Sequence, residues 1–529
     1  MFKPALLFQD GMVLQRGTPV PVWGLADPGA EVEVTIQGCA ARTRAAADGR
    51  WQLTVGPLSV SFGEEMTLRS GGCCLRLRDV QVGEVWLAAG QSNMEFYMRY
   101  DADVEAVRPD CADGALRFFD YPKVSYPGQL EQADYLARYG RWRQAAPDQL
   151  CWFSAVGYYF ARELRRRYDL PVGILGCNWS GTPACAWMSE EAIRAGGGEI
   201  YLREYREAAA ALDPAEYERT FRQFPGSWRI DPMGEDGYDR MMWGDRAALH
   251  CPPPPDPAAP QPPMPPLGPK SEKRPAGLHE SMLCQVAPYG VRGILFYQGE
   301  SDGDRHNELY KTLFPALIED FRRLWGAPLP FLFVQLAPLE RWQDSDGSRY
   351  ALIRAAQQQA ADTVPGVGMA VISDVGMRWD IHPKKKQPVG YRLALQACRR
   401  VYGEDILCEA PTLAEAWAEP GAIRLRFDHA GEGLYLAERL PDGTPADPHR
   451  LGGVALTLDG APLDAAALDA AAQGDTITLR GAALHPGVLT VAVGCGGWYA
   501  VNLYNSAGLP ARPTCRTTGG PKPEKERVL

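Results

Sequence analysis

The sequence predicts an α/β protein in which a central parallel sheet is flanked by a β-sandwich domain at each end of the chain. Three observations support this fold class. Strand-like runs fill roughly the first 80 residues, apolar runs alternate with helical stretches between about 81 and 402, and strand-like runs then return. A chain of 529 residues is also too long for one hydrophobic core, so several domains are expected.

The two terminal regions share a pattern of short strands separated by turns. Residues 1–80 contain VPVWGLA, EVEVTIQG and WQLTV, with turn sequences such as DPGA and ADGR between them. Residues 403–518 contain AIRLRFDH, VALTLDG, DTITLRG and VLTVAVG. We therefore expect β-sandwich domains over both ranges and a disordered tail over 519–529.

Residues 81–402 show the alternation that is typical of a parallel sheet with helices on both faces. Five apolar runs (VGEVWLAAG, VGILGCNW, VRGILFYQG, LPFLFVQLAP and GMAVISDVG) predict buried strands. Amphipathic stretches at 156–168, 309–325, 350–363 and 390–402 predict the helices. Ligands of such sheets bind beyond the carboxyl ends of the strands, and the motifs described below all lie at such ends.

A proline-rich segment interrupts the central region. Residues 251–270 contain 11 prolines in 20 residues, so they can form neither a helix nor a central strand. We expect an insertion over about 205–277 that crosses the surface, either as a solvated spacer or as a ligand for a partner domain.

Composition excludes several classes of partner. A net charge of −10 argues against nucleic acid, because phosphate binding needs a basic face. No apolar window approaches the ~18 residues of a membrane-spanning helix, and the N-terminus lacks the apolar core of an export signal. The 13 cysteines, with no C-x-x-C pair, indicate reduced thiols and no zinc site. These features predict a cytoplasmic protein, or a secreted or periplasmic one if a leader has been removed.

Ser92 lies in the sequence GQSNM, directly after the strand EVWLAA. A serine at the turn between a buried strand and a helix occupies the nucleophile position of an α/β hydrolase. Backbone N–H groups at the start of the following helix could stabilise an oxyanion. The G-x-S-x-G elbow is absent because position 94 is Met, and Ser92 could equally be a helix cap.

A second candidate is the pair Asp380 and His382 after the strand MAVISDVG. A histidine that acts as a general base needs an acceptor to hold its far ring nitrogen, and Asp-x-His in a loop can provide one. A surface Asp and His pair is the alternative. Asp374, within ISDVG, is expected to be structural.

Two further loops follow predicted strands. Gln298 and Glu300 flank Gly299 at the end of VRGILF, which places an amide and a carboxylate at the active edge of the sheet. The loop Asn178–Thr182 follows VGILG and is small enough to direct an N–H group into a cleft. In isolation, either loop could be ordinary turn chemistry.

Together, the motifs resemble those of the sialate O-acetylesterase family of SGNH-type carbohydrate esterases. The segments are GEVWLAAGQSNMEF, GILGCNWSGTPACAW, GILFYQGES and DIHPKKKQPVGYRLALQA. LFQDGMVLQRGTPVPVWGLADPG and WYAVNLYNSAGLPARP resemble the β-domains of the same family, so the resemblance spans most of the chain. It implies an SGNH-hydrolase-like (flavodoxin-like) three-layer domain over 81–402 and a carboxylic ester hydrolase that needs no cofactor.

The resemblance also implies roles for individual residues. Ser92 becomes the nucleophile and His382 the general base, with an acetyl-enzyme as the intermediate. The backbone N–H groups of Ser92 and Gly181 and the side chain of Gln298 form the oxyanion hole. The superfamily usually has Asp-x-x-His where this chain has Asp-x-His, so the orienting acid is either Asp380 or, alternatively, Glu300.

The same loops supply candidate substrate contacts, namely Gln91, Asn93 and Trp179. The aromatic side chains of this region could stack on a sugar or pack in the core; they are Phe96, Tyr97, Trp179 and Trp187. The implied substrate is an O-acetylated carbohydrate, with O-acetylated sialic acid first and acetylated xylan or another glycan second. The chain could instead be a non-catalytic carbohydrate-binding protein, or a thioesterase or peptidase with the same triad.

Overall fold

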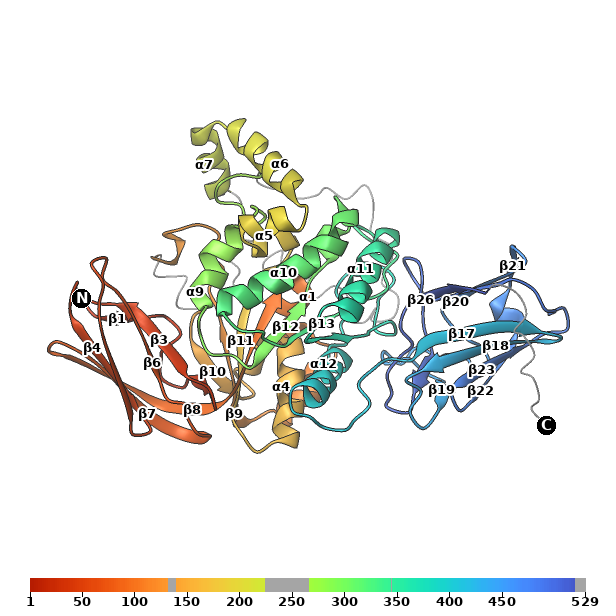
Figure 1. Cartoon of the computed structure of the whole chain (residues 1–529), viewed down its shortest axis with the longest axis horizontal. Coiled ribbons are helices and arrows are strands. Elements are labelled where there is room, and N and C mark those ends of the chain that lie inside the picture. The colour runs from red at the N-terminus through yellow and green to blue at the C-terminus, as the bar shows by residue number, and fades with distance from the viewer. Residues whose placement is uncertain (132–138, 224–265, 344, 519–529) are drawn as a thin grey trace.

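The computed structural model describes residues 1–131, 139–223, 266–343 and 345–518. Three parts follow one another along the long axis of the molecule (Figure 1). Strands of the N-terminal part lie at one end, a sheet covered by helices occupies the centre, and the C-terminal strands form the other end. None of the described helices is long and apolar enough to span a membrane.

The N-terminal strands form antiparallel sheets in which buried and exposed residues alternate. In β6 the alternation is complete, with Trp51, Leu53 and Val55 directed inward. β3 pairs with β1 and β6, β4 with β5 and β7, and β7 with β8, while β2 pairs in parallel with β8. The strands are β1 (Lys3–Pro4), β2 (Val13–Gln15), β3 (Val20–Leu25), β4 (Glu31–Ile36), β5 (Cys39–Arg44), β6 (Arg50–Val55), β7 (Ser61–Ser70) and β8 (Cys73–Gly90).

Strand β8 belongs to both the N-terminal and the central part. Its first half pairs antiparallel with β7, and its second half pairs in parallel with two strands of the central sheet. The predicted boundary between residues 80 and 81 therefore falls inside one continuous strand. Buried side chains of both parts also form one hydrophobic cluster, so β8 anchors the central sheet to the N-terminal strands.

The central sheet has the order β10-β9-β11-β8-β12-β13-β16, and its strands run parallel except for β10. β11, β12, β13 and β16 are buried along their whole length, which explains their continuous apolar sequences. A strand is thus present in each of the five predicted runs, although β13 and β16 are shorter than predicted and β9 and β10 were not predicted. The strands added here are β9 (Asp113–Asp120), β10 (Trp142–Ala145), β11 (Val172–Asn178), β12 (Gly293–Tyr297), β13 (Phe331–Val334) and β16 (Val367–Ala370).

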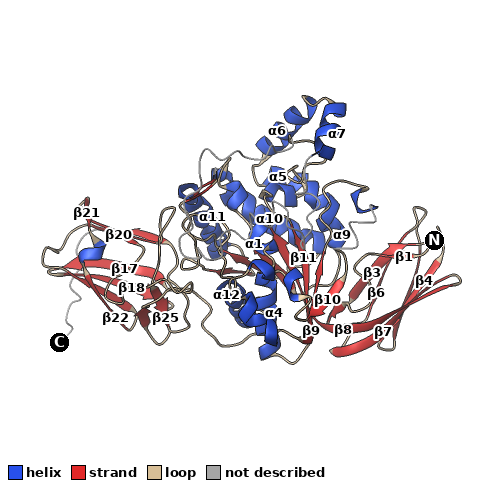
Figure 2. Cartoon of the chain, turned by 180° about the vertical axis from the view of Figure 1, so that it is seen from behind, coloured by secondary structure: helices blue, strands red, loops and turns tan. Residues whose placement is uncertain are grey.

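Helices cover both faces of this sheet, and the α/β class is confirmed (Figures 1 and 2). The four predicted helices are present as α4 (Ala155–Arg167), α10 (Tyr310–Trp325), α11 (Tyr350–Thr363) and α12 (Gln387–Arg400). α4 packs against α12 on one face, and α10 packs against α11 on the other. Shorter helices are α1 (Ser92–Glu95), α2 (Val104–Val107), α5 (Glu190–Ala195), α6 (Glu199–Ala210), α7 (Pro214–Gln223) and α9 (Cys284–Val286).

The predicted insertion begins within α6 and continues through α7, which project from the central part (Figure 1). Most of the proline-rich segment lies outside the described residues, as does the tail over 519–529.

The C-terminal strands enclose a hydrophobic core of their own. Two four-stranded sheets have the orders β17-β18-β23-β22 and β21-β20-β24-β26, and β19 pairs with β25. The strands are β17 (Thr412–Glu419), β18 (Ala422–Asp428), β19 (Leu434–Leu436), β20 (Val454–Leu458), β21 (Ala461–Leu463), β22 (Asp469–Gln473), β23 (Thr476–Arg480), β24 (Leu489–Val493), β25 (Leu503–Asn505) and β26 (Thr514–Thr517). A small hairpin of β14 (Arg341–Trp342) and β15 (Ser345–Asp346) lies in the central part.

Candidate active site

The three loops that carry Ser92, Gly181 and Gln298 begin at the same level of the central sheet. Asn178 at the end of β11 and Tyr297 at the end of β12 both pair with Gly90, the last residue of β8. β8 is also where the sheet order reverses, because the chain continues to β9 and β11 on one side and to β12 on the other. Such a switch point is the usual position of a ligand site in a parallel sheet.

The turn that presents Ser92 depends on glycine. Gly90 has φ +135, and a Cβ atom there would lie 2.2 Å from the carbonyl oxygen of Tyr297. Gln91 donates its N–H to that carbonyl at 3.0 Å, and its side-chain oxygen accepts the N–H of Ser301 at 3.2 Å. Ser92 then opens α1, a single turn of helix. Any oxyanion stabilisation here therefore comes from individual N–H groups and not from a long helix dipole.

Glu95 fixes the neighbouring loop that carries Gly181. Its Oε2 accepts both the N–H of Ser180, at 2.7 Å, and the hydroxyl of Ser180, at 3.0 Å. Trp179 donates its N–H to the carbonyl of Gly90 at 3.1 Å. Gly181 is exposed at φ +70, and a Cβ atom there would meet nothing within 4 Å. A side chain at position 181 would therefore meet open space, in the loop that Trp179 joins to the carbonyl of Gly90.

The buried side chain of Lys123 holds Asn178, at the start of the loop that carries Gly181. Lys123 donates to the carbonyl oxygen and the side-chain oxygen of Asn178, at 2.5 and 2.8 Å. Its Nζ also lies 3.8 Å from Glu95 Oε1 and 3.7 Å from Asp120 Oδ1. Burial raises the pKa of the Glu95 carboxyl group, and the charge of Lys123 opposes that shift.

The structure places the second candidate pair close together, but Nδ1 of His382 has no hydrogen-bond partner in the described structure. Asp380 Oδ1 accepts the backbone N–H of His382 at 2.8 Å and lies 3.5 Å from its Nδ1. Asp380 Oδ2 lies 2.9 Å from the Nζ of Lys384. Burial opposes ionisation, but the hydrogen bond of His382 and the charge of Lys384 lower the pKa of Asp380 to about 2. The edge of His382 packs against the ring of Trp342, with ring centroids 5.3 Å apart.

The environment of His382 favours its neutral form. Burial lowers its pKa to about 4, reinforced by the charges of Lys384 and Lys386 and opposed by Asp380. At neutral pH the ring therefore carries one proton, and its other nitrogen can accept one.

Asn93 connects the turn that carries Ser92 to the loop that carries His382. Its amide nitrogen donates to Glu300 Oε1 at 2.6 Å and to the carbonyl of Ile381, the neighbour of His382, at 3.0 Å. Its oxygen accepts from Lys386 Nζ at 2.5 Å. Burial raises the pKa of Glu300 to about 7 and lowers that of Lys386 to about 7.

The side chain of Gln298 is engaged by the protein. Its amide nitrogen donates to the carbonyl of Thr182, at 3.2 Å, and to Asp302 Oδ2, while its oxygen accepts from Tyr310 at 3.0 Å. In the described structure both N–H groups of this amide are therefore used, and none is left for an oxyanion. What Gln298 does hold in place is the loop of Gly181.

The predicted substrate contacts lie mostly below the surface. Asn93 is 0% exposed, and Gln91 and Trp179 are each 2% exposed. The amides of Gln91 and Asn93 bind protein groups, as described above. The aromatic candidates Phe96, Tyr97 and Trp187 are also buried, which matches packing in the core.

Five charged residues of this region were not singled out from the sequence. They are Glu95, Lys123, Asp302, Lys384 and Lys386. The run Lys384–Lys386 directly after His382-Pro383 was one visible signal, because it places charge next to the predicted base. Glu95 lies within one of the quoted motifs, Asp302 directly follows another, and Lys123 is distant from them in sequence. Within the described ranges, no group of three or more His, Cys, Asp or Glu side chains is arranged to hold a metal ion.

Comparisons with known proteins show which proteins this chain resembles. A family model described as "Carbohydrate esterase, sialic acid-specific acetylesterase" matches residues 277–396, which include Gln298, Glu300, Asp380 and His382. Sialate O-acetylesterase of Mus musculus is 27% identical over 81% of this chain and 79% of its own length. The Homo sapiens protein of the same name is 27% identical over 80% of this chain and 76% of its own length.

A solved structure extends the similarity to the whole chain. The crystal structure of a carbohydrate acetylesterase from Xanthomonas citri aligns with a TM-score of 0.71 and 29% identity, covering 97% of this chain and 99% of that one. The resemblance predicted from the sequence is confirmed by these similarities.

Proposed function

We propose that this chain, a relative of the sialate O-acetylesterases, is a carboxylic ester hydrolase that removes O-acetyl groups from carbohydrates, with O-acetylated sialic acid as its substrate. The observation that carries the mechanism is the pairing of Asn178 and Tyr297 with Gly90. It brings the loops of Ser92, Gly181 and Gln298 to one edge of the sheet, where Asn93 connects them to the His382 loop.

In this mechanism Ser92 attacks the acetyl carbonyl while neutral His382 accepts its proton. The C–O bond to the sugar then breaks, and His382 returns the proton to the departing sugar hydroxyl. Water, deprotonated by His382, releases acetate from the acetyl-enzyme and restores the Ser92 hydroxyl.

Asp380 is the proposed orienting acid. It lies 3.5 Å from Nδ1 of His382 and stays ionised, because its pKa is about 2. Glu300 binds Asn93 and has a pKa of about 7. We therefore assign it the role of holding Asn93, next to Ser92, and not that of orienting His382.

The oxyanion hole that we propose consists of the N–H groups of Ser92 and Gly181. Glu95 and Gln298 act by positioning, since one binds Ser180 and the other binds the carbonyl of Thr182. This revises the predicted direct role of the Gln298 amide, whose donors are already in use.

The finer fold assignment is part of the same proposal. Parallel strands between two helical layers support an SGNH-hydrolase-like domain, and the terminal strands support the two β-sandwich domains. The 12 free cysteines among the described residues support the predicted cytoplasmic location. Recovery of the native protein mainly from a periplasmic or culture fraction would contradict that location.

Substrate choice is tested by measuring acetate released from O-acetylated N-acetylneuraminate and from acetylated xylan at equal ester concentration. We expect the higher kcat/KM with the sialic acid ester. A preference for xylan would select the second glycan substrate. No acetate from either substrate or from a small acetyl ester would favour a non-catalytic carbohydrate-binding protein.

A further inference from the structure

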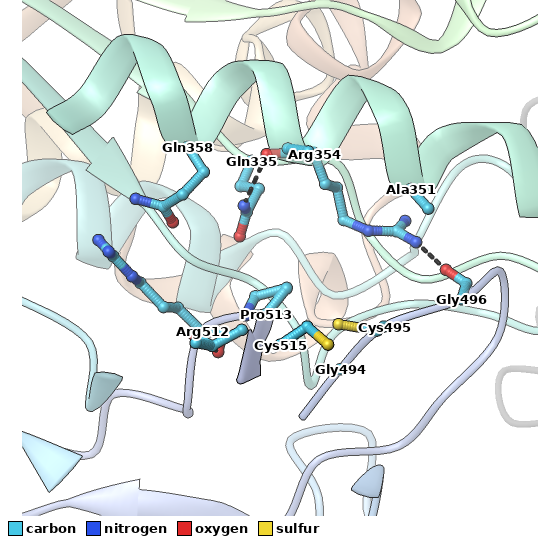
Figure 3. A pocket seen from close by; sticks show the side chains of 12 residues that line it. Gln335, Ala351, Arg354, Gln358, Gly494, Cys495, Gly496, Arg512, Pro513 and Cys515 are labelled. Atoms are coloured by element: carbon cyan, nitrogen blue, oxygen red, sulfur yellow. Dashed lines mark hydrogen bonds between the residues drawn. The ribbon is translucent and has the colours of Figure 1, made fainter. Parts of the chain in front are cut away.

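A cavity of about 330 Å³ lies between helix α11 and the C-terminal strands, away from Ser92 (Figure 3). Arg354 and Gln358 of α11 form one wall, with Gln335 from the loop after β13. Arg512 and Thr514, at the start of β26, form the opposite wall. The volume falls within the range of about 300–1,000 Å³ that is typical of small-molecule sites.

Arg354 is a buried cation without a counter-charge. Its side chain is 2% exposed and donates to the backbone carbonyls of Ala337, at 3.3 Å, and Gly496. Its guanidinium also lies 5.2 Å from the ring centre of Tyr499. Among the described residues, no carboxylate lies within 4.0 Å of it. Because a buried charge is costly unless it is paired, the cavity that Arg354 lines should attract an anion.

Each wall offers a hydrogen-bonding atom that no protein group of the described structure uses. Arg512 lies 3.3 Å from Asp362 through Nη1, but its Nε is buried without a hydrogen-bond partner in the described structure. The side-chain oxygen of Gln358 is likewise buried without a partner, while its nitrogen donates to Asp362 at 3.0 Å. Gln358 and Arg512 face each other across the cavity in Figure 3. Buried polar atoms are rarely left in this state unless water or a ligand binds them.

We propose that this cavity is a second ligand site that binds an acidic monosaccharide. Arg512 is balanced by Asp362 and Arg354 is not, so the walls leave one positive charge, which matches a single carboxylate. Gln335 and Gln358 each donate one amide N–H to the protein and keep the second for a sugar hydroxyl. The hydroxyl of Thr514 donates to the carbonyl of Arg512 at 3.2 Å and can accept from a sugar hydroxyl. The proposal does not depend on the esterase activity, since none of these residues belongs to the candidate active site.

The test is isothermal titration calorimetry of the full chain with glucuronate, which is not a product of the proposed reaction. We expect one bound molecule per chain, and no binding of glucose, which lacks the carboxylate. Acetate, which lacks the hydroxyl groups, should bind at least about tenfold more weakly, a loss of 1.4 kcal/mol. Ser92→Ala should leave glucuronate binding unchanged, so failure of the esterase proposal and of this one can be told apart.

Two variants locate the site. Arg512→Gln removes a side chain that is 21% exposed and therefore tolerant of change, and should weaken glucuronate binding about tenfold or more. Ala355→Phe fills the cavity from the exposed face of α11 and should abolish binding without removing a charge. Arg480→Gln, an exposed arginine on β23, is the matched control and should bind as the wild type does.

The proposal is overturned if glucuronate gives no binding heat. It is also overturned if glucose or acetate binds as tightly as glucuronate, or if glucuronate affinity is the same in Arg512→Gln and Ala355→Phe as in Arg480→Gln.

Discussion

At the scale of single residues, the account depends on a buried histidine that stays neutral. His382 is surrounded by one carboxylate and two lysines, and burial outweighs the attraction of Asp380 for its proton. A neutral imidazole beside an ionised carboxylate is the state that a general base requires before it acts.

The pH dependence follows from this environment. Because the pKa of His382 is lowered to about 4, the base is deprotonated above that value and is lost only as the pH falls through it. The acid limb of kcat/KM should therefore lie near pH 4, well below the ~6.5 of an ordinary histidine. In Lys384→Met one of the nearby positive charges is absent, so the limb should move to higher pH. A wild-type limb near 6.5 would contradict the account.

The two candidate acids can be separated by substitution. Asp380→Asn should lower kcat by about 10³–10⁴, since the charged carboxylate 3.5 Å from Nδ1 of His382 is lost. Glu300→Gln keeps the hydrogen bond to Asn93 and should cost much less, about tenfold at most. The reverse order of the two effects would make Glu300 the orienting acid. Circular dichroism of both variants controls for misfolding.

At the scale of elements, the end of β8 is the most constrained part of the site. Gly90→Ala should lower the free energy of unfolding by about 1–3 kcal/mol, because its Cβ would collide with Tyr297 and the backbone has a positive φ. The esterase rate should fall with it, since the same turn presents Ser92. Urea denaturation measures the first effect, and Gly181→Ala, which shares the positive φ but has nothing within 4 Å of the added Cβ, isolates the cost of the collision. Equal stability of Gly90→Ala and wild type would be inconsistent with this geometry.

Helices and strands of the central part were predicted well where the pattern of apolar residues within the element itself indicates its type. Apolar strands such as β11 and helices such as α10 are fully encoded by composition and periodicity, so their positions were predicted closely. The motifs at Ser92 and His382 follow strands and were found for that reason.

Contacts between distant segments could not be predicted in this way. Nothing near Glu95 indicates that it binds Ser180, and nothing near Gln298 indicates that Asp302 and Thr182 occupy its amide. The continuity of β8 was also missed, because a strand that exchanges one set of neighbours for another shows no break in its own sequence.

In the molecule as a whole, a buried ion pair of the central part is tied to the C-terminal strands by a hydrogen bond. Asp374 accepts two hydrogen bonds from Arg392 of α12, at 2.6 and 2.7 Å, and a third from the hydroxyl of Tyr504 in β25, at 2.9 Å. The structural role predicted for Asp374 is thus confirmed.

Breaking this connection should destabilise the molecule in proportion to the charge left unpaired. Asp374→Ala leaves Arg392 buried without its partner and should cost about 3–5 kcal/mol. Tyr504→Phe removes one hydrogen bond to a charged group and should cost about 1.5–3 kcal/mol. Chemical denaturation followed by fluorescence measures both. A larger loss in Tyr504→Phe than in Asp374→Ala would contradict this order.

The most direct test of the central claim is acetate release from O-acetylated N-acetylneuraminate by wild type, Ser92→Ala and the matched control Ser301→Ala. Ser301 lies in the adjacent loop, where it contributes its backbone N–H to Gln91, and that contact survives the substitution. We predict that Ser92→Ala lowers kcat by at least about 10⁴ and that Ser301→Ala stays within about tenfold of wild type. Acetate release by folded Ser92→Ala at a rate near that of wild type would contradict the account.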